Sequence, residues 1–246
     1  MTLVLDHVAK SYRTRGVWTD VLRDVNATFE PGQSVGILGA PKSGKSTLMR
    51  IISRETAPSA GRVRRSSCVS FLVGSGGGTD RMLAARDVIA FVARVYGVRT
   101  RGIIDFVADF GELREDLGER MSSLSKDKKA RLLFTLAYAL PFDIYLADEA
   151  ILGGPQDFQE RCAALVHERR KTSGLIFTTS KVQKVRDFAN VGAMLHQGEL
   201  FIFPSVEEAI RAYEMLNPMA HLYNLLPDPE EAEEEPEEVD GGLGLF

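Results

Sequence analysis

The chain has 246 residues, and 44% of them are hydrophobic, which is enough for a buried core in one large domain or two small lobes. No apolar stretch approaches the ~18 to 20 residues of a membrane-spanning helix, and the N-terminus lacks the basic and apolar regions of a signal peptide, so we expect neither insertion nor export. Cys68 and Cys162 lie far apart and lack metal-site spacing, which gives little support to a disulfide framework or a zinc site and favours a reducing, cytosolic setting.

The net charge of −4 conceals an uneven distribution along the chain. Residues 228–240 carry nine acidic side chains and no Lys or Arg, and without them 25 acids face 30 bases, a charge of +5. This Pro-punctuated segment has almost no side chains that could bury apolar area. We therefore predict a disordered, solvated acidic tail over residues 227–246.

Short apolar runs typical of β-strands recur along the chain, and helical periodicity fills much of the space between them. The predicted strands are Met1–Val4, Val21–Phe29, Ser34–Leu38, Ser67–Val73, Ile144–Ala147, Gly174–Thr178, Gly192–Leu195 and Glu199–Phe203. The predicted helices are Asp87–Tyr96, Ile103–Leu113, Ala130–Leu140, Gln156–Lys171 and Ser205–Leu216. This order predicts an α/β core interrupted by a mostly helical insert at about residues 82–140.

A glycine-rich loop follows the third predicted strand and leads into a helix that we expect to open at Lys45. Such a loop holds a polyphosphate through inward-pointing backbone N–H groups and the positive end of the helix dipole. Lys45 is expected to reach the β- and γ-phosphates, and the Ser46 hydroxyl to ligate Mg²⁺. The loop satisfies the pattern G-x-x-x-x-G-K-[ST] and consists of Gly39, Ala40, Pro41, Lys42, Ser43, Gly44, Lys45, Ser46 and Thr47.

A second feature supports this prediction, because the strand Ile144–Ala147 ends in two acids, Asp148 and Glu149. Asp148 is placed to hold the Mg²⁺ shell, and Glu149 to polarise an attacking water. By itself such a strand end is more often a surface turn. About 100 residues after a phosphate loop, it indicates nucleotide chemistry.

The phosphate loop, the helical insert, SSLSKDKKARL at residues 122–132 and YLADEA at residues 145–150 together resemble the ATP-binding subunits of ABC transporters. Within that family, the chain is most similar to subunits that power the export of capsular polysaccharide. The resemblance covers most of residues 3–215. It implies an ABC-type P-loop NTPase domain at residues 1–226, in which a RecA-like core carries an antiparallel β subdomain and the helical insert.

The resemblance also implies ligands, partners and location. ATP and Mg²⁺ are the implied cofactors, Tyr12 would stack on adenine, and Lys45 and Glu149 would be catalytic. An alternative for Tyr12 is an aromatic residue packed at the end of an early strand. The implied partners are a membrane permease subunit and a second ATP-binding subunit, identical or different, in a head-to-tail dimer at the inner face of the bacterial inner membrane. No nucleic-acid partner is implied.

The sequence departs from the family pattern at several positions. Where the family signature reads L-S-G-G-Q, this chain has Ser125 followed by Lys126, Asp127 and Lys128, which is also good helix-starting chemistry. Ser180 aligns with the family's switch histidine, and serine cannot carry that charge. Asp80 is the nearest candidate for the glutamine that reaches Mg²⁺, and Pro155 falls where the family places a bridging aspartate.

These departures leave three hypotheses open. The first is an exporter ATPase subunit whose hydrolysis is slow or depends on a partner. The second is a regulatory or structural relative that binds nucleotide without turning it over. The third is an ordinary active exporter ATPase. An unrelated P-loop kinase or GTPase is disfavoured, because the chain lacks an N-K-x-D guanine motif and has the long helical insert.

Overall fold

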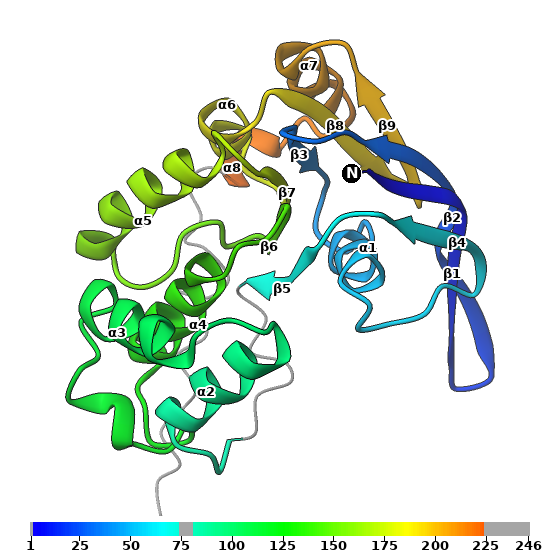
Figure 1. Cartoon of the computed structure of the whole chain (residues 1–246). Coiled ribbons are helices and arrows are strands. Elements are labelled where there is room, and N and C mark those ends of the chain that lie inside the picture. Colours follow the sequence, from blue (N-terminus) through cyan, green and yellow to red (C-terminus); the bar gives the residue numbers. More distant parts are fainter. Residues whose placement is uncertain (1, 74–80, 224–246) are drawn as a thin grey trace, which may run out of the picture.

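The computed structural model describes residues 2–73 and 81–223 as two β-sheets with helices packed around them (Figure 1). The strands are β1 (Leu3–Thr14), β2 (Val17–Phe29), β3 (Ser34–Leu38), β4 (Ala60–Arg65), β5 (Val69–Val73), β6 (Ile144–Asp148), β7 (Gly174–Thr179), β8 (Val191–His196) and β9 (Glu199–Phe203). The helices are α1 (Lys45–Ile52), α2 (Ala85–Val95), α3 (Thr100–Phe110), a 3₁₀ turn η1 (Asp116–Gly118), α4 (Lys126–Ala139), α5 (Gln156–Arg169), α6 (Val182–Phe188), α7 (Val206–Leu216) and α8 (Ala220–Tyr223).

The larger sheet has six strands in the order β5-β6-β7-β3-β8-β9. Strands β5, β6, β7, β3 and β8 run parallel, and β9 returns antiparallel to β8. The central strands β3 and β7 are buried along their whole length, as expected when both faces of a parallel sheet are covered. Their carboxyl ends lead into the loops that carry the predicted site.

Side chains of the six-stranded sheet alternate between two separate cores. On β6, Ile144 and Leu146 join a core shared with α1 and the smaller sheet, whereas Tyr145 and Ala147 join a core shared with α2 to α7. This period of two is the geometry of a strand covered on both faces. Helix α1 therefore lies between the two sheets, and α4 and α5 lie on the opposite face (Figure 1).

The smaller sheet is antiparallel, with the order β2-β1-β4. Strands β1 and β2 form a long hairpin whose turn, Arg15-Gly16, has φ angles of 50° and 86°, as a tight two-residue turn requires. Gly61 approaches the backbone of His7 so closely that a Cβ atom would lie 2.0 Å from the His7 carbonyl oxygen. Only glycine fits there, and this contact accompanies a register shift between β1 and β4.

Most of the predicted elements are confirmed, but several differ. Strands β3 and β9 have the predicted bounds, and α1 begins at Lys45 as expected. The first two strands are longer than predicted because the hairpin extends to Thr14 and back from Val17. Strand β4 and helices α6 and α8 were not predicted.

Helices α2, α3 and α4 all fall within residues 82–140. The acidic segment 228–240 lies outside the described residues. In the described ranges, no helix has the length and hydropathy needed to cross a membrane.

Candidate nucleotide site

The phosphate loop occupies the turn between β3 and α1. Lys42 and Gly44 adopt left-handed backbone conformations, with φ angles of 66° and 103°, and this curls the loop around the start of α1. At Gly39 a Cβ atom would lie 2.5 Å from the Ser43 hydroxyl oxygen and 3.1 Å from the Leu195 carbonyl oxygen, so a larger residue would force the Ser43 side chain to move. The Gly39 amide donates to the Thr179 carbonyl at 3.2 Å, which fixes the loop to the end of β7.

The start of α1 is left open for a ligand. The residue before the helix is Gly44, which has no side chain, so no side-chain cap satisfies the first amides of α1. Beside them lies a cavity of about 260 Å³, and the Ser43 hydroxyl is buried without a hydrogen-bond partner among the described residues. The cavity is lined by Val21, Pro41, Lys42, Gly44, Lys45, Ser46, Thr47 and Glu149. Free amides at a helix N-terminus beside a cationic side chain form a binding site for anions.

Lys45 is the cationic centre of this cavity. Its side chain is only 6% exposed, and the ammonium donates to the carbonyl oxygens of Gly39 at 2.8 Å and Ala40 at 3.1 Å. It also lies 3.0 Å from a carboxylate oxygen of Glu149, whose side chain is 23% exposed. Bringing the terminal phosphate of a nucleotide to Lys45 therefore means that the phosphate shares or displaces the Glu149 carboxylate.

The two acids at the end of β6, Asp148 and Glu149, are held by β7 and the residue that follows it. Asp148 pairs in register with Thr178, whose hydroxyl donates to an Asp148 carboxylate oxygen at 2.5 Å. The second Glu149 carboxylate oxygen accepts from the Ser180 amide at 3.2 Å. Ser180, at the expected histidine position, thus contacts Glu149 through its backbone.

The donors present suit Mg²⁺. Ser46 lies at the exposed start of α1, and Asp148, at the end of β6, offers carboxylate oxygens. In the described ranges, no group of three or more His, Cys, Asp or Glu side chains gathers as a metal cage. A hydroxyl and a carboxylate are the kinds of oxygen donor that Mg²⁺ uses, one or two per ion with water and phosphate completing the shell, and of Ser46 and Asp148 only Ser46 lines the cavity. The third candidate ligand, Asp80, lies outside the described residues.

Several predicted residues lie outside the cavity lining: Tyr12, Gly39, Ala40, Ser43, Ser125 and Asp148. Tyr12 lies on β1 and pairs with Thr19 of β2, which is two residues nearer the hairpin tip than the cavity-lining Val21. Tyr12 is 37% exposed. The Lys10 ammonium lies 5.1 Å from the centre of that ring. Sequence reasoning did not predict that Val21 lines the cavity, because no motif marks an aliphatic residue on a neighbouring strand.

Ser125 lies at the start of α4, also away from the cavity lining. Its hydroxyl caps the helix by accepting from the Lys128 amide at 3.3 Å, and Asp127 lies in the first turn, which confirms the predicted helix-starting chemistry. Ser125 and the two residues after it are exposed. The Lys128 ammonium donates to Asp116 at 2.7 Å, so its charge is directed to this chain's own carboxylate.

Comparison with known proteins assigns the chain to a family. The family model described as ABC transporter matches residues 22–152, which include the phosphate loop and the acid pair. The chain belongs to the ABC transporter family. The family's capsule polysaccharide export ATP-binding protein CtrD of Neisseria meningitidis is 32% identical over 86% of this chain and 98% of its own length. The polysialic acid transport ATP-binding protein KpsT of Escherichia coli is 31% identical over 86% of this chain and 96% of its own length.

Solved structures agree on the fold. The ATP-binding cassette MJ0796, in a dimeric post-hydrolysis state bound to ADP and Pi, superposes with a TM-score of 0.70 at 20% identity. The superposition covers 80% of this chain and 96% of that one. The fold is thus the ABC type of P-loop NTPase. Its RecA-like core contains the six-stranded sheet, the antiparallel sheet forms the β subdomain, and α2, α3 and α4 belong to the helical insert.

Proposed function

We propose that this chain is the ATP-binding subunit of an ABC exporter of capsular or other surface polysaccharide. The observation that carries the proposal is the cavity in which the Lys45 ammonium, uncapped helix amides and Glu149 meet. The similarity to CtrD and KpsT over nearly their whole length supports the transport role. The proposed partner is a membrane permease subunit, with the ATPase at the inner face of the bacterial inner membrane.

In this proposal the loop amides and Lys45 bind the phosphates of ATP, and Tyr12 stacks on adenine. Ser46 and Asp148 would hold Mg²⁺, which when bound neutralises charge that builds on the phosphates during transfer. Glu149 takes a proton from the attacking water, because a carboxylate beside Lys45 lies next to the position of the terminal phosphate. The proposed domain is residues 1–226, with the helical subdomain at about 82–140 and an acidic tail at 227–246.

We also propose that hydrolysis is slow or depends on a partner. Ser180 offers only a neutral side chain where a histidine charge would help to hold the phosphate and water. In a head-to-tail dimer, whether with an identical or a different subunit, the start of α4 would present Asp127 to the partner's ATP. A carboxylate about 4 Å from a phosphate charge is repelled by roughly 4 kcal/mol at an effective dielectric near 20.

The test compares ATP affinity and steady-state hydrolysis for three proteins: the wild type, Lys45→Ala and Glu149→Gln. We expect Lys45→Ala to weaken ATP binding by more than about tenfold, because it removes the buried cation. Glu149→Gln is expected to retain binding and lose hydrolysis. A surface substitution of matched charge, Lys171→Ala, serves as the control, because Lys171 pairs with Glu168 after α5, away from the cavity lining.

The result separates the proposal from its alternatives. Wild-type hydrolysis that appears or rises only on mixing with a subunit bearing an intact signature supports the partnered exporter. Turnover by the wild type alone at about 1 per second or faster, abolished by Glu149→Gln, contradicts slow hydrolysis. ATP binding with a wild-type rate equal to that of Glu149→Gln, even with partners, indicates a regulatory protein that only binds nucleotide. Unaltered ATP binding by Lys45→Ala contradicts the site itself.

A further inference from the structure

Glu149 has an unusual backbone conformation for a residue with a long side chain. Its φ angle is 59°, and the Ala150 amide donates to the Asp148 carbonyl at 2.7 Å, so residues 148–150 form a tight turn closed across Glu149. A turn of this kind with positive φ is rare, and it persists only where surrounding contacts hold it. Its geometry sets the direction in which the Glu149 carboxylate leaves the chain.

Each polar group of Glu149 has a specific partner. The amide donates to the Thr178 carbonyl at 3.0 Å, and the carboxylate contacts the Lys45 ammonium and the Ser180 amide. The remaining group, the main-chain carbonyl, accepts from the Lys184 ammonium at 2.8 Å. A hydrogen bond from an ionised donor is shorter and stronger than a neutral one, so this is a firm constraint on the peptide that follows Glu149.

The position of Lys184 is fixed by the packing of α6. The helix is anchored by the buried residues Val182, Val185 and Phe188. Val185, next to Lys184, fits into the space left by Gly36 of β3, where an added Cβ atom would lie 2.8 Å from a Val185 methyl carbon. The half-buried Lys184 side chain therefore extends from a firmly packed helix to the turn at Glu149.

We propose that Lys184 is a positioning residue, which holds the left-handed Glu149 turn through the main-chain carbonyl and so keeps the carboxylate beside Lys45. Lys184 does not itself touch the nucleotide in this proposal. Its consequence for turnover rests on the proposed ATPase function, whereas its effect on the turn does not. Loss of the ammonium lets the 148–150 turn relax, and the carboxylate then spends less time in the orientation that accepts a proton from water.

The experiment uses the full chain in three variants. Lys184→Met removes the ammonium and keeps the aliphatic stem, and Lys184→Arg retains a cationic donor. Arg186→Met, which breaks the pairing of the same helix with Glu207, is the matched control for lost charge and altered α6 packing. The first readout is hydrogen exchange at the Ala150 amide without nucleotide. The second is single-turnover ATP hydrolysis beside ATP affinity, in the presence of whichever partner supports turnover.

We expect Lys184→Met to speed exchange at Ala150 by tenfold or more and to lower the hydrolysis rate similarly, with ATP affinity within twofold of wild type. Lys184→Arg should restore both readouts, and Arg186→Met should change neither. Unchanged exchange in Lys184→Met, or equal acceleration in Arg186→Met, overturns the proposal. If the wild type binds no ATP, the proposed function fails instead, and the exchange comparison alone decides the role of Lys184.

Discussion

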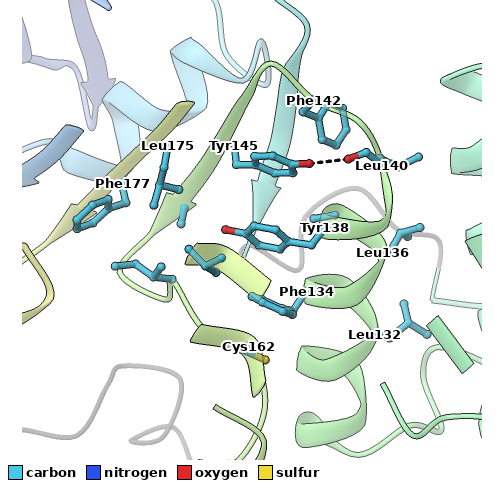
Figure 2. Close-up of a cluster of buried hydrophobic side chains, with 14 of the residues drawn as sticks. Leu132, Phe134, Leu136, Tyr138, Leu140, Phe142, Tyr145, Cys162, Leu175 and Phe177 are labelled. Atoms are coloured by element: carbon cyan, nitrogen blue, oxygen red, sulfur yellow. Dashed lines mark hydrogen bonds between the residues drawn. The ribbon is translucent and has the colours of Figure 1, made fainter. Parts of the chain in front are cut away.

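At the scale of single residues, Tyr138 and Tyr145 stack in the core between α4 and β6 but differ in hydrogen bonding (Figure 2). Their ring centres lie 4.7 Å apart with planes 6° from parallel. The Tyr145 hydroxyl donates to the Leu140 carbonyl at 2.7 Å, whereas the Tyr138 hydroxyl is buried without a partner among the described residues. Burial of an unpaired hydroxyl costs about 1 to 3 kcal/mol, so Tyr138 stabilises the core less than phenylalanine would.

The pair supplies a matched prediction. Tyr138→Phe should raise the free energy of unfolding at neutral pH by about 1 kcal/mol, because it removes the unpaired hydroxyl and keeps the stacked ring. Tyr145→Phe should lower it by about 1 kcal/mol, because the Leu140 carbonyl loses its donor. Urea denaturation of both variants beside the wild type measures the difference. A change of the same sign in both variants would contradict the assignment.

The same substitution also has a pH signature. Burial raises the pKa of Tyr138 well above its ordinary value, so the folded state binds this proton more tightly than the unfolded state. The stability that this tighter proton binding gives the folded state is fully present below the unfolded tyrosine pKa of about 10 and is lost as pH rises above it. Tyr138→Phe should therefore lose less stability than the wild type between neutral pH and pH values above about 10.

At the scale of elements, α4 and α7 begin in the same way. The Ser125 hydroxyl accepts from the Lys128 amide at 3.3 Å, and the Ser205 hydroxyl accepts from the Glu208 amide at 3.2 Å. Each helix also has an acidic side chain in its first turn, where the positive end of the helix dipole stabilises the negative charge. Helix α4 is therefore capped by its own sequence without any ligand.

Ser125→Ala should consequently lower the free energy of unfolding by about 1 kcal/mol, the usual cost of losing such a cap. Ser205→Ala, which removes the equivalent cap of α7, is the matched control and should cost a similar amount. Denaturant titration measures both. If Ser125→Ala leaves the free energy of unfolding unchanged while Ser205→Ala lowers it, the Ser125 cap does not stabilise α4 and the prediction is wrong.

The elements that sequence patterns missed share a physical cause. Strand β4 is mostly exposed, and Arg62 and Arg64 reach back to Asp6, so it lacks the apolar alternation of a half-buried strand. The tip of the β1-β2 hairpin is exposed along β2, so no burial pattern marks it. Helix α6 has seven residues, too few for a helical period to stand out. Strands that are buried on both faces of the sheet, such as β3 and β7, were predictable because continuous apolar runs mark them.

The site shows a similar division. The phosphate loop and acid pair were predictable, because bonding to phosphate and metal demands particular side chains at a fixed spacing. The Lys45–Glu149 contact follows from two strands ending at one edge of the sheet. The contact from Lys184 was not predictable, because its acceptor is a main-chain carbonyl and its helix was not expected. Ser180 was identified as a departure, yet its backbone contact with Glu149 appears only in the fold.

At the scale of the whole molecule, the head-to-tail dimer proposed above would place the start of α4 over a neighbour's ATP. This surface is exposed and carries Lys126 and Asp127 where the family has glycine. Because Lys128 binds Asp116, its charge is drawn away from any incoming phosphate. Longer side chains and an exposed carboxylate both oppose close approach of backbone amides to a phosphate.

A double substitution, Lys126→Gly with Asp127→Gly, should therefore promote ATP-dependent dimerisation in a Glu149→Gln background. Glycine removes both the bulk and the repelling carboxylate. Glu149→Gln is expected to stop ATP hydrolysis, so the dimer does not dissociate through turnover. Sedimentation with and without ATP measures the shift, and Lys126→Met with Asp127→Asn, which removes both charges and keeps both side chains long, separates lost charge from lost bulk. Identical sedimentation of the glycine variant in both conditions would contradict the charge argument.

The left-handed turn at Glu149 has a practical consequence for anyone who engineers this protein for heat resistance. Replacing a non-glycine residue at a positive φ angle by glycine relieves backbone strain of about 1 to 3 kcal/mol, so Glu149 would rank among the candidates for such a change. Such a replacement would remove the proposed proton acceptor along with the strain. A variant selected by melting temperature alone would thus tend to lose the proposed ATP hydrolysis while keeping its fold.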